Sequence, residues 1–152
     1  MFFNKRRVEI RKHKPKLVLA PHFGDRHIDH DRAGLLLKDV NLFTRLKKSR
    51  SGYDPHAPEL YLFYLLQDFV SPTLVIDISE EYEQKLKAIK AYQSQFVKTA
   101  DEYEIKPIGI SDYLFHVETR SRFCGSLINT RYGEALISLS PLPIRDPLKI
   151  LK

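Results

Sequence analysis

The stretch from Leu19 to Gly34 concentrates side chains that could do chemistry. It reads LAPHFGDRHIDHDRAG and holds three histidines and three aspartates. His27 and His30 are three positions apart, and residues at this spacing share one face at the start of a helix. Two imidazoles beside carboxylates can bind Zn²⁺, or one can bind the metal while the other polarises a substrate. Histidine and aspartate are also common caps and turn formers ahead of a helix, so the spacing leaves a structural role open.

The carboxylates in this stretch are candidates for fixing the tautomer of a neighbouring imidazole. These candidates are Asp25, Asp29 and Asp31. A different arrangement would have His22, Asp25, His27 and His30 converge on one ion, since Zn²⁺ accepts nitrogen and oxygen ligands in a tetrahedron. Residues so close in sequence rarely meet the tight geometry of a metal site without help from a second element.

The predicted elements around this stretch would place it at the end of a strand. Residues 16–21, KLVLAP, form a short apolar run that predicts a buried strand, and residues 31–46 have the period of a helix. Further along the chain the pattern predicts strands at 60–66 and 73–79, helices at 80–96 and 112–130, and a late strand or extended tail at 135–144. Pro141 and Pro143 argue against a central strand in the last of these segments.

This alternation of strands and helices predicts a single α/β domain over residues 1–152. Continuously apolar strands are typical of a mostly parallel sheet covered by helices on both faces. Ligands of such sheets bind in the crevice at the carboxyl ends of the strands, which is where the histidines follow residues 16–21. No glycine-rich phosphate loop and no G-x-S-x-G motif occurs in the sequence.

Charge and composition exclude several classes of function. The net charge is +6, and residues 1–16 alone hold seven Lys/Arg and one Glu, a balance of +6, so the rest of the chain is neutral overall. A nucleic-acid partner is therefore not expected, because such proteins carry a basic face or stripe. The longest apolar runs are too short for a membrane span, and the basic start lacks the apolar segment of a signal peptide. Cys124 is the one cysteine. We expect a cytoplasmic protein in which this thiol is a small buried residue.

Several strings together resemble the LmbE/PIG-L family of zinc-dependent N-deacetylases. They are KPKLVLAPHFGDRHIDHDRAG, YQSQF and RYGE, and the resemblance runs over essentially the whole chain. It is strongest to the bacillithiol biosynthesis deacetylases. The resemblance implies a Rossmann-like three-layer sandwich. It also implies zinc-dependent hydrolysis of the N-acetyl group of an N-acetylglucosaminyl conjugate, such as N-acetylglucosaminyl malate.

The resemblance also implies roles for individual residues. His30 would be a zinc ligand and His27 would stabilise the oxyanion of the tetrahedral intermediate. Asp29 would orient one of the two histidines, and Arg26 would lie at the edge of the substrate. Three later polar residues are candidates for substrate contact: Arg120, Tyr132 and Glu134. An alternative for Glu134 is a structural ion pair with Arg120 or Arg131, and Gln95 is expected to be a helix-end residue.

One family motif has no counterpart in the sequence. Family members begin with a strand that leads into H-P-D-D, which supplies two further zinc ligands and the general base, and this string is absent. We therefore expect an N-terminally truncated domain in which His30 alone cannot hold catalytic zinc. Three hypotheses stay open. The chain could be part of an enzyme completed by an N-terminal fragment or a homo-oligomer, an inactive sugar-binding or subunit-interaction module, or an unrelated basic binding module.

Overall fold

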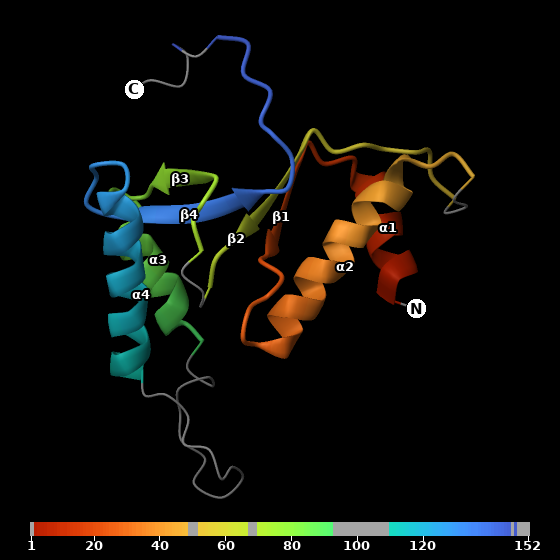
Figure 1. Ribbon diagram of the computed structural model, residues 1–152. Helices are drawn as coiled ribbons and strands as arrows, with labels where there is room; N and C mark the ends of the chain where they lie inside the picture. Colours follow the sequence, from red (N-terminus) through yellow and green to blue (C-terminus); the bar gives the residue numbers. More distant parts are fainter. Residues whose placement is uncertain (1, 49–51, 67–69, 93–109, 147, 149–152) are drawn as a thin grey trace, which may run out of the picture. The chain divides into compact units, whose positions relative to one another are not determined.

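The computed structural model describes residues 2–48, 52–66, 70–92, 110–146 and 148 (Figure 1). Its elements follow the chain in this order: α1 (Phe2–His13), β1 (Leu17–Pro21), α2 (Ile28–Arg45), β2 (Leu60–Tyr64), β3 (Leu74–Asp77), α3 (Tyr82–Lys90), α4 (Ile110–Ser126) and β4 (Gly133–Ser138). The predicted α/β class is confirmed by this mixture of helices and strands.

The four strands form one sheet in the order β1-β2-β4-β3. β1 and β2 are parallel, as the apolar runs predicted, and the structure sets Leu17 opposite Leu60. β4 runs antiparallel to β2, with Tyr64 opposite Leu136, so the sheet is mixed. A parallel pair needs a long crossover connection, and α2 provides it between β1 and β2.

The expectation that Pro141 and Pro143 keep the late segment out of the sheet centre is wrong. β4 ends at Ser138 and lies between β2 and β3 in the strand order. Both prolines come after the last paired residue, so neither removes a backbone donor from the ladder. The sequence pattern placed the end of this strand too late.

The chain divides into two compact units. Unit 1 comprises residues 1–74 and 136–152, and unit 2 comprises residues 75–135. The boundaries fall within β3 and β4. Each unit is described by itself below.

The core of unit 1 is formed where β1 and β2 lie side by side (Figure 1). Phe63 is fully buried there, and Ala20 and Tyr61 are buried with it. Leu37 from α2 packs against this cluster. A strand rich in aromatic and aliphatic residues, LYLFY, therefore supplies the buried centre, and α2 covers it.

Arg11 of α1 holds the carboxyl-terminal end of α2. Its side chain is only 1% exposed. The guanidinium donates hydrogen bonds to the carbonyl oxygens of Phe43, Thr44 and Leu46 at 3.0, 3.1 and 2.7 Å. The last carbonyls of a helix lack partners within the helix and carry partial negative charge. A buried guanidinium there donates the missing hydrogen bonds and compensates that charge. Burial, with the nearby charge of Arg7 adding to it, lowers the pKa of Arg11.

The observed limits of the helices differ from the predicted ones by a few residues. α2 begins three residues earlier than expected, at Ile28, because His27 caps it. α3 spans Tyr82–Lys90, within the predicted 80–96. The end of that prediction, with Gln95, lies outside the described residues. α4 begins and ends slightly earlier than the predicted 112–130.

We predict that Arg11→Met destabilises the protein by about 2–4 kcal/mol, because it leaves one buried and two part-buried carbonyl groups without their donor. The measurement is urea unfolding followed by circular dichroism. Arg6→Met is the control, since Arg6 is exposed on the same helix and should change stability by less than about 0.5 kcal/mol. Equal effects of the two substitutions would contradict the capping role.

Candidate active site

The histidine-rich loop connects β1 to α2 in unit 1. The backbone N–H of His22, just after β1, donates to the carbonyl of Tyr64 at 3.0 Å, which extends the pairing with β2 by one step. Gly24 then turns the chain with φ +91°, a conformation that favours glycine. The loop therefore starts at the carboxyl end of a parallel strand pair, as predicted.

Gly34 brings α2 against this loop. A Cβ at Gly34 would lie 2.6 Å from the carbonyl oxygen of Pro21 and 2.7 Å from the backbone nitrogen of Phe23. Both neighbours are backbone atoms, which cannot rotate away. Only glycine permits this approach, so the first turns of α2 are held directly beside the loop.

His27 is the N-cap of α2, and this fixes its tautomer. Its φ and ψ are −83° and 119°, and its side chain accepts a hydrogen bond from the backbone N–H of Asp29. The acceptor is Nδ1, at 3.2 Å. In a neutral imidazole the proton is then on Nε2. His27 is exposed, so a proton on Nε2 is available to donate to a ligand.

His30 has the opposite arrangement because of Asp25. The carboxylate of Asp25 is buried, with 2% of its side chain exposed, and its Oδ1 lies 3.3 Å from Nδ1 of His30. The same oxygen accepts the backbone N–H of His27 at 2.8 Å. A carboxylate oxygen is the acceptor in this pair, so in a neutral imidazole Nδ1 of His30 carries the proton and Nε2 has the lone pair. A histidine that donates its other N–H to a carboxylate is typical of metal ligands.

The two imidazoles lie against each other. Their ring centroids are 4.5 Å apart and the planes differ by 28°. The loop thus offers a hydrogen-bond donor on His27 beside a lone pair on His30. This combination can bind one oxygen atom and one cation.

The other residues predicted in this loop lie at its surface. Asp29 is exposed and contacts His27 through its backbone N–H. The carboxylate that orients a histidine side chain in the structure is that of Asp25. Arg26 is exposed next to it in sequence. Asp31 accepts the backbone N–H of Gly24 at 2.7 Å and so stabilises the turn.

The three later candidates belong to unit 2. Tyr132 is buried and stacks on Tyr82 of α3, with ring centroids 3.6 Å apart. Arg122 donates to the Tyr132 hydroxyl at 3.2 Å and lies 5.0 Å from the ring centroid. Arg120 is half-buried on α4. Arg122 was not predicted as a site residue, although it lies only two residues after the candidate Arg120 in the sequence.

Glu134 forms an ion pair, but with a residue that was not expected. Its carboxylate lies 3.3 Å from the ammonium group of Lys85 on α3. The expected partners were Arg120 and Arg131, and Arg131 instead lies over the ring of Tyr132, 5.4 Å from its centroid. The pattern of charges in the sequence did not reveal that α3 brings a lysine to β4.

The loop by itself does not complete a metal site. Across the described ranges, no group of three or more His, Cys, Asp or Glu side chains could hold a metal ion. The four-residue arrangement of His22, Asp25, His27 and His30 is therefore wrong as a self-contained site, because Asp25 is already engaged in orienting His30. His30 alone fits zinc as one ligand of a larger set.

Two further expectations can be compared with the structure. Cys124 is buried on α4, and burial raises the pKa of its thiol, which disfavours a nucleophilic role. Within the part of the chain that the structure describes, none of the helices has the length and apolar character needed to cross a bilayer.

Comparison with curated proteins gives a similar sugar deacetylase. The chain is 31% identical over 136 residues to a diacetylchitobiose deacetylase from Thermococcus kodakarensis. The match covers 84% of this chain and 46% of the relative, so the chain spans about half the length of the curated relative that it matches. No protein-family model matches the chain.

Solved structures share the fold over nearly the whole chain. A conserved protein from Thermus thermophilus matches with a TM-score of 0.79 and 26% identity, over 93% of this chain and 59% of its own. An N,N'-diacetylchitobiose deacetylase from Pyrococcus horikoshii, complexed with an inhibitor, matches with a TM-score of 0.75 and 26% identity, over 91% of this chain and 51% of its own. The chain is thus similar to deacetylases in both sequence and fold.

We predict that Gly34→Ala destabilises the protein by about 1–3 kcal/mol, because the added methyl group overlaps backbone atoms of the loop. At a helix position with free space around it, glycine to alanine would stabilise the protein by about 1 kcal/mol. A loss of stability in Gly34→Ala therefore indicates the close approach. Urea unfolding gives the measurement, with Asp39→Ala at an exposed position of α2 as the control. A stabilised Gly34 variant would contradict the close approach.

We predict that in Asp25→Ala the His30 imidazole populates both neutral tautomers. Without the carboxylate, Nδ1 of His30 has lost its acceptor, and the proton distributes between both ring nitrogens. Long-range ¹H–¹⁵N NMR of the imidazoles measures this directly, with Asp39→Ala as the matched control. An unchanged His30 spectrum in Asp25→Ala would show that another group fixes the ring.

Proposed function

We propose that the chain carries the histidine pair of a zinc-dependent N-deacetylase, which removes the N-acetyl group of an N-acetylglucosaminyl conjugate. The observation that carries this proposal is the opposite orientation of two neighbouring imidazoles, a donor on His27 and a lone pair on His30. The similarity to diacetylchitobiose deacetylases supports the reaction class. The resemblance of DRHIDH, YQSQF and RYGE to the bacillithiol branch of the LmbE/PIG-L family supports an N-acetylglucosaminyl malate type of substrate.

His27 would act on the oxygen of the acetyl carbonyl. As water adds to the carbonyl carbon, negative charge develops on that oxygen, and a fixed N–H donor stabilises it more than it stabilises the ground state. The N-cap bond from Asp29 occupies Nδ1, which favours the neutral tautomer with its proton on Nε2 and restrains the ring. The residue therefore needs no reorganisation when the charge appears.

His30 would be one ligand of the zinc ion, through Nε2. The hydrogen bond to Asp25 fixes the direction of the ring, so that Nε2 faces away from the carboxylate. The described residues form no group of three metal-binding side chains, so we propose that the remaining ligands, and the general base with them, come from a complementing fragment or a homo-oligomer. The single thiol, Cys124, fits a reducing cytoplasmic setting.

Arg26, Arg120, Tyr132 and Glu134 are proposed to contribute to substrate binding. Arg26 follows Asp25 directly and is exposed at the loop, which is the position expected for a contact at the edge of the substrate. The ion pair between Glu134 and Lys85 and the stacking of Tyr132 give these two residues structural roles as well.

The proposal predicts release of a free amine from acetylated amino sugars in the presence of zinc. The assay incubates the full chain with N-acetylglucosaminyl malate or diacetylchitobiose and detects the amine with fluorescamine. We expect His27→Ala to lower kcat by about 10²–10³-fold with little change in KM, because it removes a transition-state interaction. His30→Ala should abolish the zinc-dependent rate.

His116→Ala is the control, because His116 is exposed on α4 in unit 2 and should leave the rate unchanged. A rate that is the same in His27→Ala and in the unaltered chain would overturn the role of His27. Absence of amine release from both substrates would contradict completion of the site by a homo-oligomer of this chain, and would favour a site completed by a separate fragment or the inactive sugar-binding module. The ratio of the two substrate rates distinguishes the bacillithiol type from the chitobiose type.

A further inference from the structure

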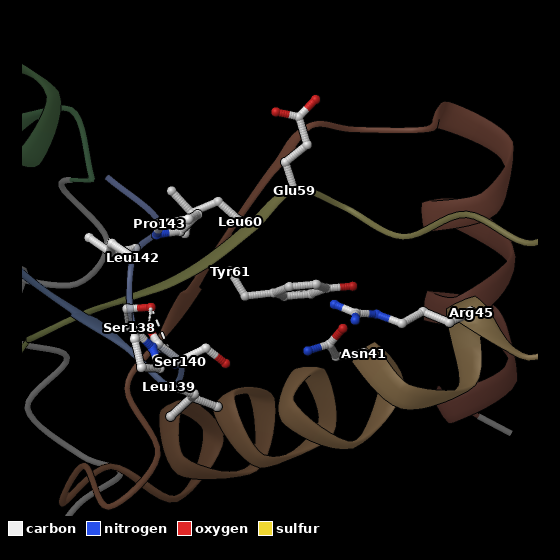
Figure 2. Close-up of a pocket in the computed structure, with 11 residues that line it drawn as sticks. Asn41, Arg45, Glu59, Leu60, Tyr61, Ser138, Leu139, Ser140, Leu142 and Pro143 are labelled. Carbon is white, nitrogen blue, oxygen red and sulfur yellow. Dashed lines mark hydrogen bonds between the residues drawn. The ribbon is translucent and has the colours of Figure 1, made fainter. Parts of the chain in front are cut away.

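A polar cavity lies within unit 1, at the other end of α2 from the histidine loop. It has a volume of about 250 Å³. Its walls come from the last turns of α2, the start of β2 and the segment that follows β4 (Figure 2). Polar groups of Asn41, Arg45 and Tyr61 meet there, and Leu60 and Leu139 add apolar surface. The cavity therefore lies at the amino-terminal end of β2.

Two buried polar atoms of this cavity have no hydrogen-bond partner among the described residues. They are the hydroxyl oxygen of Tyr61 and the side-chain carbonyl oxygen of Asn41. Tyr61 is only 8% exposed. The hydroxyl of nearby Thr44 donates instead to the backbone carbonyl of Asn41, at 2.9 Å. A buried polar group without a partner costs about 1–3 kcal/mol, so two in one place point to a bound molecule, either a ligand or ordered water.

The third polar group is the guanidinium of Arg45. Figure 2 shows it beside the Tyr61 hydroxyl and the Asn41 amide, while the Glu59 carboxylate extends away from them. Arg45 is exposed, so its side chain can shift to admit a ligand to the two covered atoms. Burial raises the pKa of Tyr61 by more than the neighbouring Thr44 and Arg45 lower it, which keeps the hydroxyl protonated and able to donate. Two donors, the Arg45 guanidinium and the Tyr61 hydroxyl, therefore lie beside one acceptor, the side-chain carbonyl of Asn41.

We propose that this cavity binds a small organic carboxylate that also carries a hydroxyl group. The carboxylate would accept from Arg45 and from the Tyr61 hydroxyl, since charge-assisted hydrogen bonds of this kind are the stronger ones. The hydroxyl of the ligand would donate to the Asn41 carbonyl. A short aliphatic body would occupy the space beside Leu60 and Leu139.

This site is separate from the histidine pair. His27 caps the start of α2 and Arg45 is its last residue, and a helix of 18 residues is about 27 Å long. The ligand would therefore not touch the groups proposed for catalysis. Loss of deacetylase activity, if observed, would leave this proposal unaffected.

The test is a titration of the full chain with α-hydroxyisovalerate, followed by saturation-transfer NMR. The uncharged α-hydroxyisovaleramide is the matched probe, because it has the same shape without the carboxylate. We expect saturable binding of the acid only, weakened about tenfold by Arg45→Gln and by Tyr61→Phe, which corresponds to about 1.4 kcal/mol each. Lys47→Gln removes a charge just beyond α2 at a residue that does not line the cavity, and should leave the affinity unchanged.

A stability measurement keeps the test decisive if a variant folds poorly. Tyr61→Phe removes an unpartnered hydroxyl, so without ligand its resistance to urea should equal or exceed that of the unaltered chain. Equal binding of acid and amide, or an affinity that Arg45→Gln does not change, would overturn the proposal. Absence of binding together with a destabilised Tyr61→Phe would show that an ordered water holds the hydroxyl, and would overturn it too.

Discussion

The buried carboxylate of Asp25 is the group on which the histidine loop depends. One of its oxygens accepts both the backbone N–H of His27 and the ring N–H of His30. It therefore fixes where α2 begins and how His30 presents its remaining nitrogen. Because almost none of this carboxylate is exposed, water cannot easily replace either bond, and each bond constrains the other.

α2 connects this loop to the rest of unit 1 and is held at both ends. His27 satisfies a backbone donor at its start, and Arg11 satisfies three carbonyls at its end. Gly34 lets the helix lie close against the loop, next to His27 at its N-cap and His30 in its first turn. The same helix ends in Arg45 at the polar cavity, so one rigid element presents polar groups at both ends.

Much of this arrangement could be predicted from local patterns. The apolar runs predicted β1 and β2, and the i, i+3 spacing predicted that His27 and His30 lie together, which they do with their ring centroids 4.5 Å apart. Which of three nearby aspartates would be buried could not be predicted, because burial of Asp25 depends on how the whole loop folds. The partners of Glu134 and Arg11 could not be predicted either. Lys85 is far from Glu134 along the chain, and the end of α2 is far from Arg11. Long-range pairs of this kind leave no period in the sequence.

The most direct test of the two histidine roles is the zinc affinity of the full chain in three forms: unaltered, His30→Ala and His27→Ala. We propose different roles for the two neighbouring imidazoles. We therefore predict a loss of affinity in His30→Ala of at least about 10–100-fold, since even changes to the partners of metal ligands have effects of this size. His27→Ala should bind zinc almost as well as the unaltered chain. Equal losses in both variants, or none in His30→Ala, would contradict the assignment of the metal to His30 and of the oxyanion to His27.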